Sequence, residues 1–190
     1  DGEVYIDNTV LLLQGDDKPA SVTQNNTFID SSESPLTIIR NSNVTQGTFS
    51  PFDRAITNSG GSAYFDGTGD YLSTNSSNNF AFGTGNFTVE CWIYSSDVSF
   101  ATQRGFLQTS DTVGGLKTSF TTGILIGAGS PVNGALFATV AGTNVGSSTA
   151  VITTNTWYHI ALVRNSGTST LYVNGTSVGS ATTTGNCSGT

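Results

Sequence analysis

The chain has 190 residues, of which 36% are hydrophobic, enough for a core, but only 10% are charged, far below the roughly 25% of ordinary globular proteins. Gly, Ser, Thr and Asn fill the difference, a composition typical of many short strands joined by turns. The net charge of −7, with six Lys and Arg, argues against binding to nucleic acid or to anionic membrane surfaces.

No apolar run reaches the roughly 20 residues that span a bilayer, so membrane insertion is not expected. The chain starts at Asp1 and contains no Met, so we expect a piece of a longer or processed polypeptide, with residues 1–9 as an arm or linker. The N-terminal third shows short strand-like runs separated by turns, at 10–15, 36–40, 63–67 and 70–74. The segment 47–53 is expected to be an edge strand or a loop, because Pro51 cannot donate a backbone hydrogen bond to a neighbouring strand.

The strongest strand signal is NFTVECWIYS at 86–95. Its alternation predicts one face formed by Phe87, Val89, Cys91 and Ile93, and the opposite face formed by Thr88, Glu90, Trp92 and Tyr94. Further runs follow at 104–110, 123–129, 135–142, 150–154 and 156–165. Strands at this spacing predict an all-β sandwich or barrel.

The clearest local prediction is a hairpin over LYVNGTSVG at 171–179. Asn174-Gly175 between two alternating runs fits a type I′ turn, in which both central residues need positive φ. Residues 181–190 have almost no apolar content, and the tail from Gly179 is predicted to be a loop or a truncated end rather than a closing strand.

The order of these segments carries a family resemblance. YFDGTGDYLS, then FAFGTGNFTVECWIY, then NTWYHIALVRNSGTSTLYVNGTSVGS resembles the laminin-G-like, concanavalin A-like jelly-roll family. The resemblance implies two antiparallel sheets packed face to face in one domain at 10–180. The string VTQGTFSPF at 44–52 is also similar to family members found in structural proteins of bacteriophages and marine viruses.

The chain departs from the family pattern at its C-terminal end. The family normally continues after the LYVNG hairpin with two or three more strands, and residue 190 comes before them. An absent central strand would expose an unpaired sheet edge, which is costly and prone to aggregation. We therefore expect further residues or a neighbouring chain to cover that edge.

Catalysis is not expected, although the family also contains glucanases. Retaining glycosidases need two carboxylates roughly 5–5.5 Å apart, whereas Glu3, Glu33 and Glu90 are isolated in the sequence. His159 lies within an alternating strand, which favours a half-buried structural histidine over a catalytic base.

Two pairings remain alternatives at this stage. Glu90 and Arg164 lie in the two strongest strands, where we expect a partly buried salt bridge, the alternative being Arg164 on a rim in contact with ligand. Cys91 is expected to be a buried thiol. Two cysteines do not form a disulfide framework in so long a chain, and a disulfide between Cys91 and Cys187 remains an alternative.

The ligand-binding candidates are aromatic, because the C–H faces of sugars stack on aromatic rings. Trp92 and Trp157 are expected in the core, and Tyr94 and Tyr172 on the surface as glycan-binding residues.

The turn in YFDGTGDYLS offers a second kind of site. Asp66 and Asp70 are expected to shape a tight hairpin, with Phe65 and Leu72 pointing inward. The alternative is that these two carboxylates hold Ca²⁺, which prefers six to eight oxygen ligands.

The sequence thus predicts a non-enzymatic module that binds carbohydrate or a cell surface. The resemblance implies a bacteriophage or viral virion protein (a tail fibre, head fibre or decoration) that contacts host-surface glycan and other virion chains. Such a module would be exposed on the virion or extracellular, and would act by multivalency as a homo-oligomer or part of a larger assembly. The alternatives are a purely structural protein-binding module, a secreted bacterial adhesin, and an accessory module of a carbohydrate-active enzyme, because one fold hosts all these roles.

Overall fold

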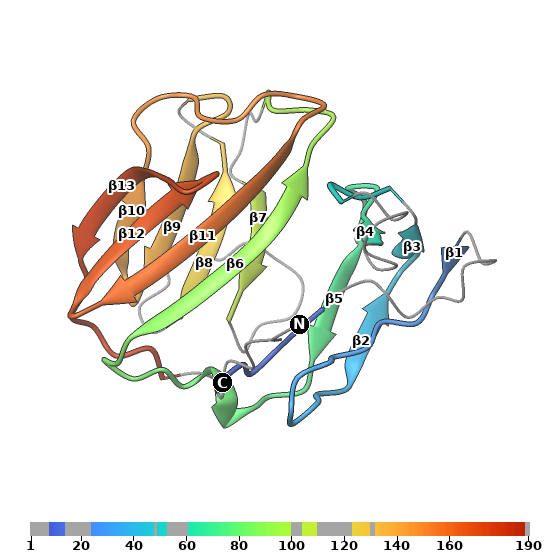
Figure 1. Cartoon of the computed structure of the whole chain (residues 1–190), viewed down its shortest axis with the longest axis horizontal. Coiled ribbons are helices and arrows are strands. Elements are labelled where there is room, and N and C mark those ends of the chain that lie inside the picture. The colour runs from blue at the N-terminus through green and yellow to red at the C-terminus, as the bar shows by residue number, and fades with distance from the viewer. Residues whose placement is uncertain are drawn as a thin grey trace. The chain divides into compact units, whose positions relative to one another are not determined.

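The structure is a computed structural model that describes residues 8–13, 24–47, 49–52, 61–99, 104–109, 123–129 and 132–188. The chain divides into two compact units, Asp1–Ser76 and Ser77–Thr190, which are described separately. Within the described ranges the regular structure is β-strand apart from one 3₁₀ turn, η1 (Asn78–Phe80) (Figure 1). A membrane-spanning helix is not found among these residues. The domain limits expected above, 1–9, 10–180 and 181–190, stay predictions.

The N-terminal unit contains two small antiparallel sheets. The first pairs β1 (Gln24–Asn25) with β3 (Thr45–Gly47) and β3 with β4 (Ser62–Tyr64), and the second pairs β2 (Ile38–Asn41) with β5 (Tyr71–Thr74). The strands predicted at 36–40, 63–67 and 70–74 are therefore present. The run predicted at 10–15 is wrong over its described residues, because positions 10–13 form no strand.

A buried carboxylate organises the loops of this unit. Asp30 is buried, and its Oδ1 accepts hydrogen bonds from the backbone amides of Leu12 (2.9 Å) and Ser32 (3.0 Å). Its Oδ2 accepts a third hydrogen bond from the amide of Leu36 (2.8 Å). Burial by itself would raise the pKa of Asp30, but these three amide donors outweigh burial and hold the pKa below its ordinary value.

The hairpin predicted for YFDGTGDYLS is wrong. The strands on either side of it, β4 and β5, belong to different sheets, so the segment connects two sheets instead of closing one. Phe65, predicted to point inward, is 47% exposed. The physical reason is that Asp70 accepts a hydrogen bond from the amide of Asn43, in the loop between β2 and β3, as well as from the amide of Asp66.

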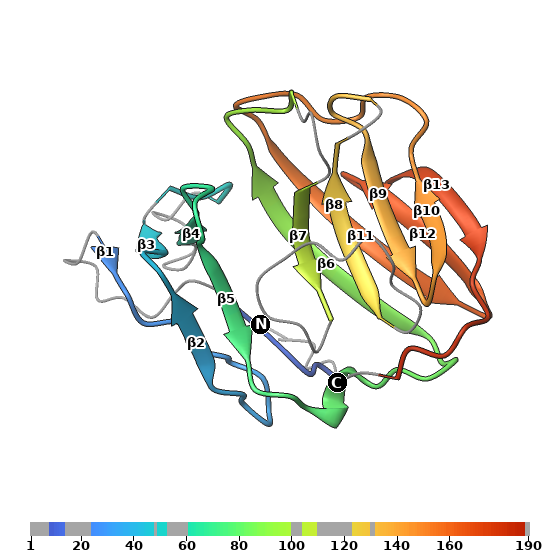
Figure 2. The same cartoon turned by 180° about the vertical axis from the view of Figure 1, so that it is seen from behind.

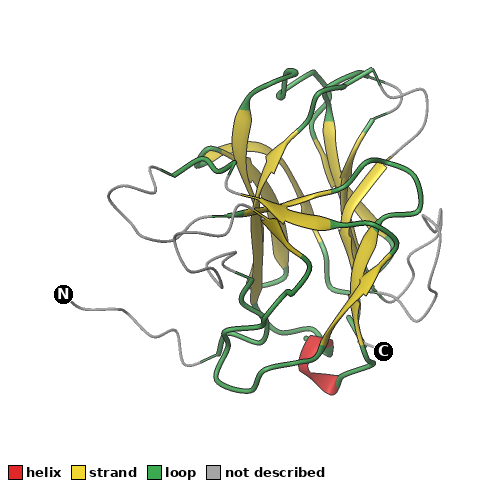
Figure 3. Cartoon of the chain, turned by 90° about the vertical axis from the view of Figure 1, so that its right-hand side faces the viewer, coloured by secondary structure: helices red, strands yellow, loops and turns green. Residues whose placement is uncertain are grey.

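The C-terminal unit is a sandwich of two four-stranded antiparallel sheets, as Figures 1, 2 and 3 show from three directions. The front sheet of Figure 1 has the strand order β13-β12-β11-β6, and the back sheet has the order β10-β9-β8-β7. This confirms the predicted jelly-roll class of fold. The front strands are β6 (Phe87–Tyr94), β11 (Trp157–Asn165), β12 (Thr168–Val173) and β13 (Thr176–Thr182); the back strands are β7 (Arg104–Gln108), β8 (Ile124–Ala128), β9 (Leu136–Val140) and β10 (Thr143–Gly146).

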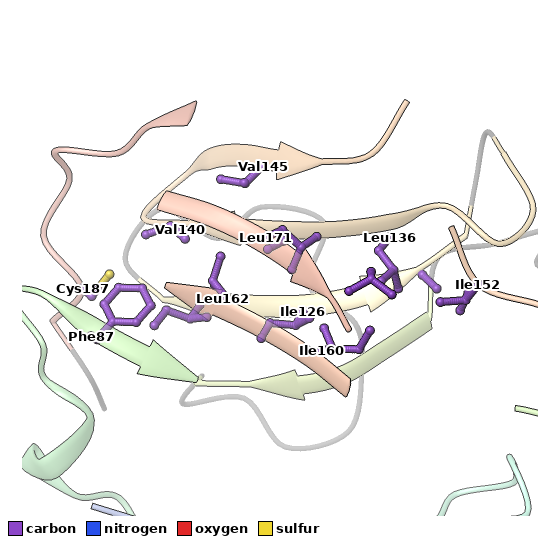
Figure 4. Close-up of a cluster of buried hydrophobic side chains, with 14 residues drawn as sticks. Phe87, Ile126, Leu136, Val140, Val145, Ile152, Ile160, Leu162, Leu171 and Cys187 are labelled. Atoms are coloured by element: carbon purple, nitrogen blue, oxygen red, sulfur yellow. The ribbon is translucent and has the colours of Figure 1, made fainter. Parts of the chain in front are cut away.

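The core lies between the two sheets (Figure 4). The front sheet directs alternate side chains into it, since residues i and i+2 of a strand share a face. On β6 the predicted division is confirmed, because Phe87 is buried while its neighbour Thr88 is exposed. The fully buried members from both sheets include Ile124, Ile126, Leu136, Val140, Ile160, Leu162 and Leu171.

Local turn chemistry explains two of the hairpins. Asn174 and Gly175 both have positive φ, +48° and +77°, which confirms the predicted type I′ turn between β12 and β13. The hairpin between β9 and β10 was not predicted, because its turn places Ala141 at φ +45°, a conformation unusual for alanine. The strand predicted at 150–154 is wrong; Val151 and Ile152 donate instead to the carbonyl of Gly134.

One side of the sandwich is closed by two glycines. A Cβ atom placed on Gly179 of β13 would lie 2.1 Å from the carbonyl oxygen of Gly146 on β10. Only glycine permits this approach of the two edge strands. The tail beginning at Gly179 was predicted to be a loop, which is wrong as far as Thr182, where β13 ends.

Arg164 of β11 joins the two ends of the C-terminal unit. Its side chain is 1% exposed and lies over the ring of Phe87, with Cζ 4.8 Å from the ring centroid. Nε donates to the carbonyl of Gly85 (2.7 Å), Nη2 to that of Gly83 (2.7 Å) and Nη1 to that of Gly185 (3.1 Å). Gly83 in turn exchanges two backbone hydrogen bonds with Cys187. The segments before β6 and after β13 are thus held by one guanidinium.

Substituting Arg164 by Met should lower the free energy of unfolding by about 3 kcal/mol, because it leaves buried carbonyl groups without a donor. Urea unfolding followed by tryptophan fluorescence measures this. Lys at the same position keeps the charge but lacks the planar fork, so it should recover only part of the loss. Equal stability of Arg164→Met and the parent chain would contradict this role.

Substituting Asp30 by Asn should loosen the loops of the N-terminal unit, because an amide NH₂ replaces one of the two acceptor oxygens. In the parent chain the depressed pKa makes the stabilising contribution of Asp30 fully present above the unfolded-state pKa of about 3.8. It is lost as the pH falls through the lower folded-state pKa. NMR titration should show the amides of Leu12, Ser32 and Leu36 moving together in this acid range, and no such shared titration in the Asn variant.

Candidate functional site

The face of the front sheet that points away from the core carries aromatic, ionisable and hydroxyl side chains. We call it the outer face; it looks towards the viewer in Figure 1. The register pairs Trp157 with Tyr94 and His159 with Trp92. The outer face consists of Thr88, Glu90, Trp92 and Tyr94 on β6, Trp157, His159, Ala161 and Val163 on β11, Thr168, Thr170 and Tyr172 on β12, and Ser177, Ser180 and Thr182 on β13.

One end of the outer face is aromatic. Trp92 is 42% exposed and its ring centroid lies 5.3 Å from that of His159, at an interplanar angle of 52°. Tyr94 is 39% exposed and stands 5.4 Å from the ring of Trp157. The hydroxyl of Tyr94 donates to Oδ1 of Asn155 (3.3 Å). Trp92 and Tyr94 are two residues apart on one strand, so their Cα atoms are roughly 7 Å apart and both rings lie on the outer face.

The carboxylate of the outer face belongs to Glu90. Its Oε2 lies 3.4 Å from Nε2 of His159, and the Glu90 side chain is 60% exposed. The predicted salt bridge from Glu90 to Arg164 is therefore wrong, and so is the alternative of Arg164 on a ligand-binding rim. The register explains both, because Glu90 pairs with Ala161 on the outer face whereas Arg164 pairs with Phe87 and points into the core.

His159 is positioned by the neighbouring hairpin turn. Its backbone amide donates to Oδ1 of Asn174 (2.9 Å), and its carbonyl accepts from the amide of Asn174 (2.8 Å). The half-buried histidine expected from the sequence is found, with Glu90 and Trp92 as neighbours. Tyr172, half-buried, lies on the same face, separated from Glu90 by the methyl group of Ala161.

The far end of the outer face is polar. A shallow hollow of about 280 Å³ lies there, lined by Asn86, Phe87, Thr88, Val163, Arg164 and Asn165. The side chain of Asn86 is hydrogen-bonded to the turn that follows β11. Its Oδ1 accepts from the backbone amide of Ser166 (2.9 Å), and its Nδ2 donates to Oδ1 of Asn165 (3.4 Å). The outer face therefore passes from aromatic rings to amide and hydroxyl groups.

The predicted metal candidates, Asp66 and Asp70, lie in the N-terminal unit. Oδ1 of Asp66 accepts from the amide of Thr68 (2.7 Å) and Oδ2 from Nδ2 of Asn43 (3.2 Å). Both oxygens of Asp70 accept backbone amides, and these hydrogen bonds hold its pKa below the ordinary value. Amide donors compete with a cation for the same lone pairs, which favours the turn-shaping role; calcium binding at these aspartates stays a prediction. Within the described ranges, three or more His, Cys, Asp or Glu do not gather into a metal-binding group.

The cysteines belong to the core side of the sandwich. Cys91 and Cys187 are both free thiols, so the alternative of a bridge between them is not realised. Burial, together with the negative charge of neighbouring Glu90, raises the pKa of the Cys91 thiol to about 11. The thiol is therefore protonated at neutral pH and has little nucleophilic character, as expected for a packing residue.

Sequence reasoning located part of this site. It placed Tyr94 and Tyr172 at the surface as glycan-binding candidates, and the structure brings both to the outer face. It expected Trp92 in the core, which is wrong. The predicted alternation placed Trp92 on the same face as Thr88 and Glu90, and this already indicated that its ring is exposed.

Comparison with known proteins gives a family match. Residues 66–190, more than half of the chain, match the family model described as the concanavalin A-like lectin/glucanases superfamily. A solved structure, the S-layer domain-containing protein (residues 221–444) of Clostridium thermocellum ATCC 27405, is similar with 21% sequence identity and a TM-score of 0.46, over 92% of this chain and 73% of that chain. Among curated proteins no match is found.

The outer face and the core face of the front sheet should respond differently to truncation. Trp92→Ala should lower the free energy of unfolding by about 1 kcal/mol, because the residue is 42% exposed and lies outside the core. Ile160→Ala, on the adjacent strand with its side chain in the core, should lower it by roughly 3 kcal/mol. Urea denaturation of both variants measures the difference, and an equal or larger loss for Trp92→Ala would contradict the assignment of an exposed outer face.

Proposed function

Because this chain belongs to the concanavalin A-like lectin/glucanase superfamily, we propose that it is a non-enzymatic module that binds carbohydrate on a cell surface. The single observation that carries the proposal is the aromatic end of the outer face. Trp92 and Tyr94 present two exposed rings beside Glu90, His159 and Asn155, which offer polar partners for sugar hydroxyls. A sugar stacks its C–H face on a ring and directs its hydroxyls to such neighbours.

A binding role rather than a catalytic one is supported by the carboxylates of the described residues. Glu90 has the imidazole of His159 as its neighbour, whereas glycoside hydrolysis of the retaining type uses a second carboxylate roughly 5–5.5 Å away. Ala161, opposite Glu90, and Trp92, two positions along, are not acids. His159 is engaged with Glu90 and the ring of Trp92 within a regular strand.

We further propose that the module acts as one of several copies on a bacteriophage or viral particle, exposed to the medium. The support is the resemblance of VTQGTFSPF at 44–52 to virion structural proteins and the scarcity of charged residues. An open platform with two rings binds weakly by itself, and joining several copies increases the affinity by multivalency.

Binding of an oligomeric form of the full chain to a glycan array tests the function. We expect binding to at least one surface polysaccharide, with Trp92→Ala weakening it by tenfold or more, since exposed aromatic anchors carry much of the energy of such sites. Phe65→Ala, an exposed ring in the N-terminal unit, is the matched control and should bind like the parent. A parallel array with chelator tests calcium at Asp66 and Asp70. Absence of binding in every condition would contradict the proposed function.

A second candidate, a structural module that binds protein in an assembly, is favoured by one observation. The N-terminal unit exposes four aromatic rings at 47% or more of their surface, those of Phe49, Phe52, Tyr64 and Phe65. Contiguous exposed apolar patches mark protein contacts, and these four rings are the groups that such a patch would use. Under this candidate Phe65→Ala, not Trp92→Ala, would weaken association with other chains of the assembly.

A further inference from the structure

We propose that the outer face selects glycans that carry free amino groups, such as polymers of unacetylated hexosamine. This inference rests on the proposed function, since it names the class of sugar that the same site would take. The combination that carries it is one exposed carboxylate beside exposed aromatic rings on an acidic chain.

The geometry places the charge of Glu90 where a stacked sugar would reach it. Glu90 and Trp92 are two residues apart on β6 and share the outer face, so their Cα atoms are roughly 7 Å apart. Nε2 of His159 lies 3.4 Å from Oε2 on the same face of the sheet. Within the described part of the chain, Oε1 of Glu90 has no hydrogen-bond donor, and the side chain is 60% exposed. An ammonium group of a ligand can therefore approach it from solvent.

The aromatic rings add to the attraction. The faces of Trp and Tyr rings attract cations, and Trp is the best of them. Trp92 lies two residues from Glu90 on the same face of β6, and Tyr172 lies on that face across Ala161. An alkylammonium group is attracted both by the ring faces and by the carboxylate. A neutral hydroxyl carries no charge and gains neither of these two attractions.

The net charge of the chain acts in the same direction. With a formal net charge of −7 the chain attracts cationic polymers over a Debye length and repels anionic ones, such as glycans rich in uronate or sulfate. Among the residues of the outer face named above, the ionisable side chains are those of Glu90, His159, Tyr94 and Tyr172, so no lysine or arginine there would recruit an anionic sugar.

Three β-1,4-linked hexamers that differ at one substituent test the inference by calorimetry on the full chain at about pH 6, where most of the sugar amines are protonated. They are the glucosamine hexamer, its fully N-acetylated form and the glucose hexamer. We expect the amine form to bind about fivefold more tightly than the other two in low salt, as an exposed charge contact with a ring contribution allows. Sodium chloride at 0.5 M should remove most of this advantage.

The variants assign the preference to the outer face. Glu90→Gln should abolish the advantage of the amine hexamer over the other two hexamers. Glu33→Gln, which removes one negative charge from the N-terminal unit, should keep the advantage. Trp92→Ala should weaken all three hexamers.

Each contrary result has a separate meaning. Equal or tighter binding of the N-acetylated hexamer, or an advantage that survives in Glu90→Gln, overturns the amine preference and leaves carbohydrate binding standing. If none of the hexamers binds but the array finds another glycan, this inference also falls while the proposed function stands. If the array too is negative, both fall.

Discussion

The C-terminal unit depends on one buried cation, the guanidinium of Arg164. A charge removed this completely from water is costly unless its donors find acceptors, and here backbone carbonyls provide them. The acceptors lie in two glycine-containing segments, one before β6 and one after β13, that bury few apolar side chains of their own. Arg164 attaches both to β11. Because β11 also carries Trp157 and His159, the strand that closes the ends of the unit contributes to the candidate site, next to Glu90, Trp92 and Tyr94 on β6.

Strands and their faces were predictable because alternation is a local property of the sequence. The runs at 86–95 and 156–165 predicted β6 and β11, and Asn174-Gly175 predicted its own turn. Pairing is not local. Asp66 and Asp70 looked like the corners of a hairpin, but Asp70 bonds to Asn43, 27 residues away, and the strands around the turn join different sheets.

Only part of the candidate site could be predicted from the sequence, because alternation is local whereas strand pairing is not. Tyr94 was assigned to the surface, yet Trp92, on the same face, was assigned to the core from the average burial of tryptophan. Arg164 was paired with Glu90 because both are charged and lie in strong strands. Arg164 alternates along β11 with the same spacing as the buried residues Ile160 and Leu162, so it lies on the opposite face of the sheet from Glu90. Charge complementarity predicts a partner only when the register is known.

The alternation of the front sheet also separates two kinds of evolutionary change. Residues 88, 90, 92 and 94 face outwards, and those between them form the core, so substitutions in one set need not disturb the other. A lineage can therefore replace Glu90 or Trp92 and acquire a new preference while Arg164 and its carbonyl partners remain unchanged. Such a sheet behaves as a constant frame with an exchangeable surface.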